Sequence, residues 1–161
     1  MVRSGDVLLN GPGDAWWHTE QGSPIAWPSR AEQFRSLIET LDRSVAAQPL
    51  TDEVVAACGE SEPVPTHLAR DGARLQVEFY RLRRQIEELD LDADLEDIRD
   101  RARSLLLYHQ WTLRDALTTA FRLPIDRRKG RPYRINGLGA PADRLRDLRN
   151  QLRAMAGTIP S

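Results

Sequence analysis

The densest group of side chains that could do chemistry is a basic stretch in the last third of the chain. From Asp126 to Arg134 the sequence DRRKGRPYR carries a net charge of +4. Arginine binds phosphate through two parallel hydrogen bonds, and a tyrosine ring can stack on a nucleic-acid base. This pattern predicts a site for nucleic acid or a protein partner, made of Arg127, Arg128, Lys129, Arg131, Tyr133 and Arg134. The alternative is a solvated loop that pairs with the acidic segment 71–98.

A second candidate is the pair Arg103 and His109 in the segment RSLLLYH. This segment resembles the Arg-x(4–6)-His motif of HEPN ribonucleases, which are small all-α proteins and often dimers. In that family two such motifs meet at a dimer cleft and cleave RNA without a metal ion. The resemblance implies catalytic roles for Arg103 and His109, with Ser104 at the adjacent polar position. The alternative is that His109 is a core histidine, since it falls on an apolar stripe and Arg103 lies one residue past that stripe.

No other combination of residues predicts a catalytic or metal site. Asp90, Asp92 and Asp94 occupy the first, third and fifth positions of an EF-hand loop, but Leu95 and Arg101 replace the glycine and glutamate that calcium binding requires. The three histidines and the single cysteine are scattered, which does not fit the ligand spacing of a zinc site. We therefore expect no metal ion, no cofactor and no established catalytic constellation.

The elements that must position these residues are helices, because apolar residues recur at spacings of four and three. One apolar stripe with this spacing follows an acidic turn and consists of Leu91, Leu95, Ile98, Ala102, Leu105 and His109. Such a stripe either fills a core or binds a partner. As a candidate partner seam we assign the preceding stripe, Leu75, Phe79, Leu82 and Ile86.

These patterns predict an all-α fold, a single-domain bundle of four to five helices spanning 29–161. The expected helices are about 30–47, 52–58, 66–89, 94–122 and 141–156, with a basic loop at 124–140. An irregular arm, residues 1–28, contains Trp16, Trp17 and Trp27 and is expected to pack across the bundle, because tryptophan buries a large apolar area.

Several residues predict where these helices begin and end. Ser29 with Glu32 matches a capping box. Pro49 predicts the end of the first helix, and Thr51, Thr66 and Asp94 predict N-terminal caps of the following ones. Gly72 lies on the apolar stripe, where it predicts either a close approach of two helices or a helix that starts at Ala73.

Composition bounds the class of protein. The chain has 161 residues, of which 40% are hydrophobic and 29% charged, which is typical of a globular domain. No apolar run nears the roughly 20 residues that cross a bilayer, and a single cysteine without an apolar export signal favours a cytoplasmic location. Residues 1–70 and 71–98 each carry a net charge of −5, whereas 99–161 carry +9.

Together these features predict a non-catalytic cytoplasmic helical module that binds another protein or itself. The first alternative is a nucleic-acid-binding protein or subunit that uses the basic residues of 127–134. The second is a metal-independent ribonuclease of the HEPN kind that uses Arg103 and His109.

Overall fold

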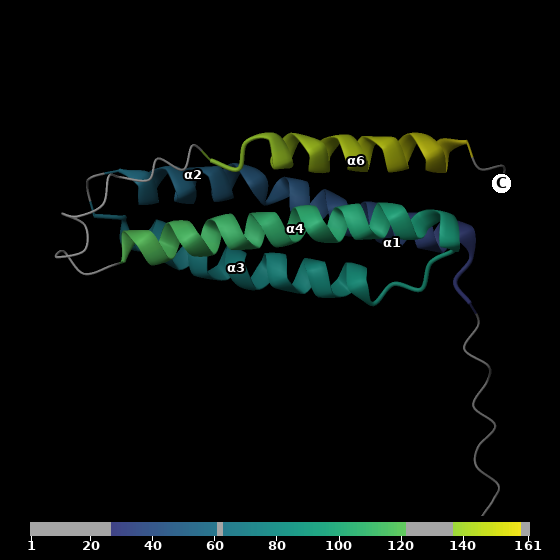
Figure 1. Ribbon diagram of the computed structural model, residues 1–161, viewed down its shortest axis with the longest axis horizontal. Coiled ribbons are helices and arrows are strands. Elements are labelled where there is room, and N and C mark those ends of the chain that lie inside the picture. Colours follow the sequence, from purple (N-terminus) through teal and green to yellow (C-terminus); the bar gives the residue numbers. More distant parts are fainter. Residues whose placement is uncertain (1–26, 61–62, 122–136, 159–161) are drawn as a thin grey trace, which may run out of the picture.

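The computed structural model describes residues 27–60, 63–121 and 137–158. Its helical segments form an elongated bundle (Figure 1): α1 (Arg30–Ala46), α2 (Gln48–Gly59), α3 (Thr66–Glu87), α4 (Ala93–Ala120) and α6 (Ala140–Gly157). Since α1 and α2 make one bent helix, four helical rods run up and down, each antiparallel to the next along the chain. The predicted all-α bundle is confirmed, and the described ranges contain no strand.

The first helix ends at Ala46, within one residue of the predicted end, but α2 begins at once at Gln48 and not at residue 52, so the rod bends at Ala47. Pro49 lies in the first turn of α2, where its missing N–H group would have no partner within that helix. Hydrogen bonds continue through the bend, because the Ala47 and Thr51 N–H groups donate to the carbonyls of Arg43 and Ala47, each at 3.1 Å. Thr51 is therefore not a cap: it is buried, and its hydroxyl donates to the Ala47 carbonyl at 2.7 Å.

The other predicted helix starts lie within two residues of those observed. Ser29 and Glu32 form the predicted capping box. Thr66 is the first residue of α3 rather than its cap. Asp92, not Asp94, precedes α4, and the Asp92 carboxylate does not cap that helix because it accepts hydrogen bonds from side chains near α1.

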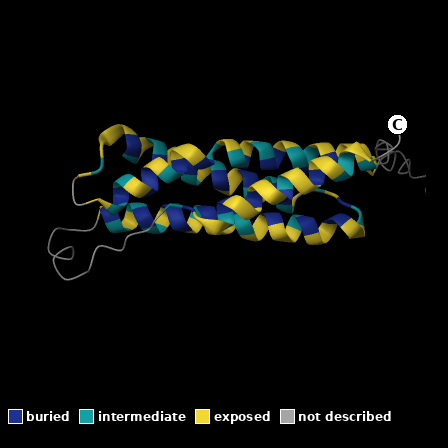
Figure 2. Ribbon diagram, turned by 90° about the horizontal axis from the view of Figure 1, so that it is seen from above, coloured by how far each residue is buried: buried dark blue, intermediate teal, exposed yellow. Residues whose placement is uncertain are grey.

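The core fills the inside of the bundle along its whole length, and buried residues line the inner face of each rod (Figure 2). It includes Phe79, Leu82 and Ile86 of α3, each 0% exposed, and Leu75, which is 8% exposed. This burial corrects the candidate partner seam, because the chain's own helices already cover all four of these residues. The folded bundle does not present this stripe to a partner.

At Gly72, α3 lies close to two other helices. A Cβ atom at this position would lie 3.0 Å from Cγ1 of Val54 on α2 and 3.0 Å from Cδ2 of Leu117 on α4. Of the two alternatives predicted from Gly72, the close approach is therefore confirmed, and α3 begins before it at Thr66. A residue without a side chain allows three helices to meet here.

The connection that leads into α6 is attached to α2. Leu138 is fully buried, and its N–H group donates to the Asp52 carboxylate at 2.7 Å. Gly137 just before it has a φ of +72°, a conformation that favours glycine, and a Cβ there would come 2.7 Å from the same carboxylate oxygen. The last residues of the predicted 124–140 loop are thus packed against the bundle.

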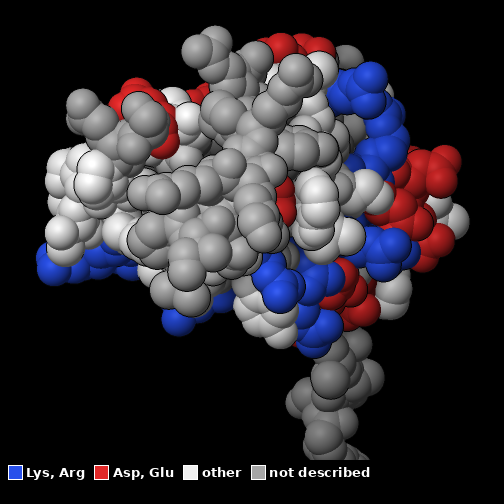
Figure 3. Space-filling view, turned by 60° about the vertical axis from the view of Figure 1, so that its left-hand side comes forward, with Lys and Arg blue, Asp and Glu red and all other residues white. Residues whose placement is uncertain are grey.

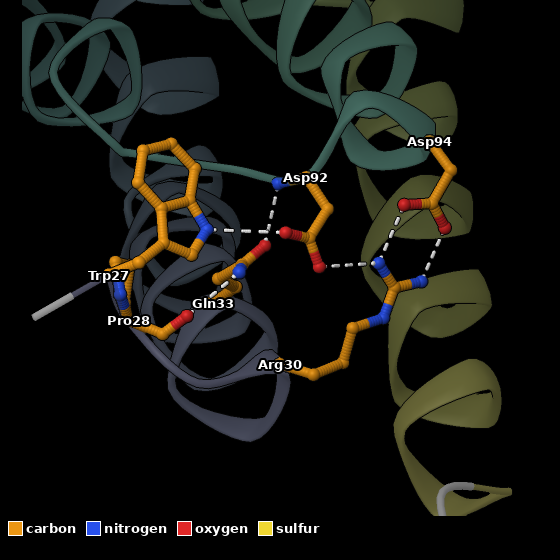
Figure 4. Close-up of polar contacts among 6 residues, drawn as sticks. All are labelled: Trp27, Pro28, Arg30, Gln33, Asp92 and Asp94. Atoms are coloured by element: carbon orange, nitrogen blue, oxygen red, sulfur yellow. Dashed lines mark hydrogen bonds and ion pairs between the residues drawn. The ribbon is translucent and has the colours of Figure 1, made fainter.

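Polar contacts attach the start of α1 to the turn before α4 (Figure 4). The Arg30 guanidinium binds the carboxylates of Asp92, at 3.1 Å, and of Asp94. The Trp27 indole N–H donates to Asp92 at 3.2 Å, and the Asp92 N–H donates to the Gln33 side chain at 2.8 Å. Gln33, Arg30 and Trp27 hold the pKa of Asp92 below its usual value, and Arg30 does the same for Asp94. Trp27 contacts the bundle through this hydrogen bond but stays 61% exposed, so the burial expected of this tryptophan is not observed.

Opposite charges lie side by side on the described surface, as the view toward the end of the bundle where α4 ends shows (Figure 3). Arg43 of α1 binds Glu78 of α3 at 2.6 Å, and Arg153 of α6 binds Asp42 of α1 at 2.7 Å. Part of the basic C-terminal third therefore neutralises the acidic N-terminal part within the fold. Exposed pairs of this kind contribute at most about 1 kcal/mol each.

Candidate interaction surface

The predicted basic site lies outside the described residues. Its members are Arg127, Arg128, Lys129, Arg131, Tyr133 and Arg134, and the described ranges stop at 121 and resume at 137. Trp16 and Trp17 of the predicted arm also lie outside the described residues. These predictions therefore stay predictions, and the candidate site must be sought on the described helices.

His109 belongs to the core and forms part of a buried polar network. Its side chain is 0% exposed, and its ring centroid lies 5.4 Å from that of Phe79. Nδ1 lies 2.7 Å from the Leu105 carbonyl, which can only accept, so Nδ1 carries the proton. Nε2 then accepts from the Gln48 amide at 3.2 Å, and the same amide donates to the Ala142 carbonyl at 3.1 Å. The network joins α4, α2 and α6.

Arg103 does not meet His109 at a common surface. Arg103 is exposed, and so is its neighbour Ser104, whose hydroxyl donates to the Asp100 carbonyl of its own helix at 2.9 Å. His109 points the other way, into the bundle, with both ring nitrogens engaged. The arrangement therefore favours the interpretation that His109 is a core histidine. It does not favour the catalytic pair of Arg103 and His109 that the HEPN resemblance implies.

Acidification is expected to destabilise the folded chain through His109. Burial lowers the pKa of His109 below 6.5, outweighing the opposing effect of the Leu105 carbonyl. Above about pH 7.5 the residue is neutral in both states and contributes no pH dependence. As the pH falls, the unfolded chain binds the proton first, so the free energy of unfolding decreases between about pH 6.5 and pH 5. Urea unfolding across this window measures the slope.

Two histidine variants provide the control for this measurement. His109→Gln removes the titrating group and should flatten the slope above about pH 5, where most carboxylates are still ionised. His67→Gln changes an exposed histidine on α3 and should leave the slope unchanged. An unchanged slope in His109→Gln would show that the buried ring is not its source.

The most unusual surface feature is a group of exposed apolar side chains on the outside of α3 and α4. Val77 and Tyr80 are 48% and 47% exposed, and Leu107 and Trp111 are 51% and 62% exposed. Each stands one or two positions along its helix from Phe79 or His109, whose rings contact each other across α3 and α4. These four side chains, which are exposed on two helices that pack on each other, are here called the outer patch.

Helical geometry places three residues of the outer patch opposite the core, whereas Tyr80 lies about 100° around α3 from Phe79. Leu107 and Trp111 are two residues before and after the fully buried His109, so each lies about 160° around α4 from it. Val77 has the same relation to the fully buried Phe79 on α3. Single exposed apolar residues are ordinary, but several at one place are typical of an interaction site. Tyr108, 41% exposed, lies at the border of this surface.

Other kinds of site find no support among the described residues. No group of three or more histidine, cysteine or carboxylate side chains there is placed to hold a metal ion. Cys58 is buried, and burial raises the pKa of its thiol, which disfavours the reactive thiolate. Within the described ranges, no helix combines the length and the apolar character that crossing a membrane requires.

Comparisons with known proteins give no lead to a function. No protein-family model, no curated protein and no solved structure matches the chain.

Proposed function

We propose that this chain is a non-catalytic helical module that associates with protein through the outer patch. The observation that carries the proposal is the exposure of four large apolar side chains, Val77, Tyr80, Leu107 and Trp111, on two helices that pack on each other. Tryptophan and tyrosine are enriched at protein interfaces, because they bury much area and lose little conformational freedom. Burying a large apolar side chain of this kind contributes about 1.5–3 kcal/mol.

The location of the outer patch suits this role. Its residues stand on α3 and α4, which pack on each other along their length. The backbone beneath the outer patch is therefore held by the core contact of Phe79 and His109. A preformed surface loses little conformational entropy on binding, so more of the burial energy remains available for affinity.

Site-specific photo-crosslinking in the cells that produce the protein tests the proposal whatever the identity of the partner. A benzophenone amino acid is placed at Leu107, and in a separate chain at Asp147, an exposed residue of α6. We expect covalent protein adducts from position 107 and few from position 147. Adding Trp111→Ser to the first chain should reduce its adducts, while the free energy of unfolding changes by less than about 0.5 kcal/mol.

Three outcomes would contradict the proposal. Equal yields at the two positions would show random collision, and no adduct at 107 would show that the outer patch is unoccupied. An adduct between 107 and nucleic acid would instead move the function toward the nucleic-acid alternative. In that alternative, binding would weaken steeply with salt and would be lost when Arg127, Arg128 and Arg131 become glutamate.

A further inference from the structure

We propose that the protein on the outer patch is a second copy of this chain, with the two α4 helices antiparallel about a two-fold axis at Leu107. This inference rests on the proposed function, since it names the partner of the same surface. It is carried by the order of charged and apolar residues along the outward face of α4.

The outward face of α4 has a seven-residue spacing. Asp100, Leu107 and Arg114 are seven residues apart and all exposed, so they share one face over almost four turns. Arg103 and Trp111, also exposed, extend this face on either side of Leu107. The face therefore has Asp100 at its N-terminal end, Arg114 at its C-terminal end and the apolar Leu107 midway between them.

A two-fold axis at Leu107 makes this order self-complementary. In an antiparallel pair related by that axis, Leu107 meets its own copy, and Asp100 stands opposite Arg114 of the other chain. Arg103 then stands opposite Trp111 of the other chain, where a guanidinium can lie over the indole ring. Each contact occurs twice, as a two-fold interface requires.

The charged residues at the two ends have little engagement within the chain. Asp100 is 59% exposed, and its ion pair among the described residues is a long one, 3.6 Å to the adjacent Arg99. Arg103 and Arg114 form no ion pair with another described residue. Charged side chains of opposite sign that face outward at matching distances from an apolar centre fix the register of an interface.

The apolar part of the surface is wider than one helix. A stable interface buries about 800 Å² on each partner, more than the outward face of a single helix of this length offers. The neighbouring α3 also carries exposed apolar side chains, Val77 and Tyr80. The two-fold axis would place α3 of each chain along the edge of the same interface.

Sedimentation equilibrium of the full chain, from about 1 to 200 µM, measures the self-association. We expect the wild-type protein to approach twice its monomer mass. Asp100→Arg and Arg114→Asp should each raise the dissociation constant at least about tenfold, because like charges then face each other. The chain that carries both substitutions restores opposite charges and should recover most of the affinity. A double variant as weak as the singles would overturn the proposed register.

A disulfide at the axis tests the same register by a second route. Leu107→Cys places two thiols face to face in the proposed pair and should give a covalent dimer under mild oxidation. The wild-type chain is the matched control, since its single cysteine, Cys58, is buried. Failure of Leu107→Cys to cross-link in a protein that still dimerises would also overturn the antiparallel arrangement.

Failure of this inference and failure of the proposed function are distinguishable. A wild-type chain that stays monomeric throughout overturns self-association. If position 107 then still gives adducts with a different protein in cells, the proposed function stands. If position 107 gives none, both proposals are overturned.

Discussion

Replacing Phe79 with alanine is expected to lower the free energy of unfolding by about 3–5 kcal/mol. The ring is 0% exposed and lies in the core, against His109 of α4. The variant loses the burial of a large apolar side chain and leaves a cavity that straight, tightly packed helices cannot close. Urea unfolding followed by circular dichroism measures the change.

Tyr80→Ala is the matched control, because it removes the next aromatic ring of the same helix. That ring is 47% exposed, with the Arg83 guanidinium 5.5 Å from its centroid. We expect a loss of less than about 1 kcal/mol. Equal losses in the two variants would contradict the assignment of Phe79 to the core and Tyr80 to the surface.

Replacing Gly72 with leucine is expected to lower the free energy of unfolding by about 1–3 kcal/mol or more. Its Cβ alone would stand 3.0 Å from side-chain atoms of both Val54 and Leu117, so a larger side chain must push α2 or α4 away. The gain in helix propensity over glycine, about 1 kcal/mol, offsets only part of this cost. The same urea titration measures the result.

Gly59→Leu makes the same chemical change where space is available, because nothing lies within 4 Å of a Cβ at Gly59. We expect this variant to change the free energy of unfolding by less than about 1 kcal/mol. A Gly72→Leu variant as stable as the wild type would show that α3 does not approach the other two helices this closely.

The helical bundle could be predicted because spacing alone encodes it. The stripe from Leu75 to Ile86 repeats at four and three residues, which in a helix makes one continuous apolar face. The same spacing could not show whether that face fills a core or meets a partner, since both require the same residues. Only the positions of the other helices around α3 show that this face is buried within the chain's own core.

The bend at Ala47 could not be predicted from Pro49 in isolation. A proline disfavours helix in the residue before it, but it is tolerated in a first turn, and the sequence does not say which of the two applies. The contacts of Arg30 with Asp92 and Asp94 were equally out of reach. They join residues about 60 positions apart, and local spacing carries no information on such pairs.

The sequence analysis did not single out the outer patch, because it followed only the apolar residues that recur at spacings of four and three. In RSLLLYHQW, the stripe takes Leu105 and His109, and Leu107 and Trp111 then fall on the opposite side of the helix. The position of Leu107 and Trp111 could have indicated the site. A helix that packs on one core buries one face, so large apolar residues on the opposite face suggest a second contact. The basic segment 127–134 was the more conspicuous pattern, but it lies outside the described residues.

The most direct test of the central claim, that the outward side of α4 binds protein, is photo-crosslinking from Leu107 compared with Asp147. We predict protein adducts at position 107 that Trp111→Ser diminishes, against a low yield at position 147. Equal yields at both positions, or none at 107, would contradict the claim.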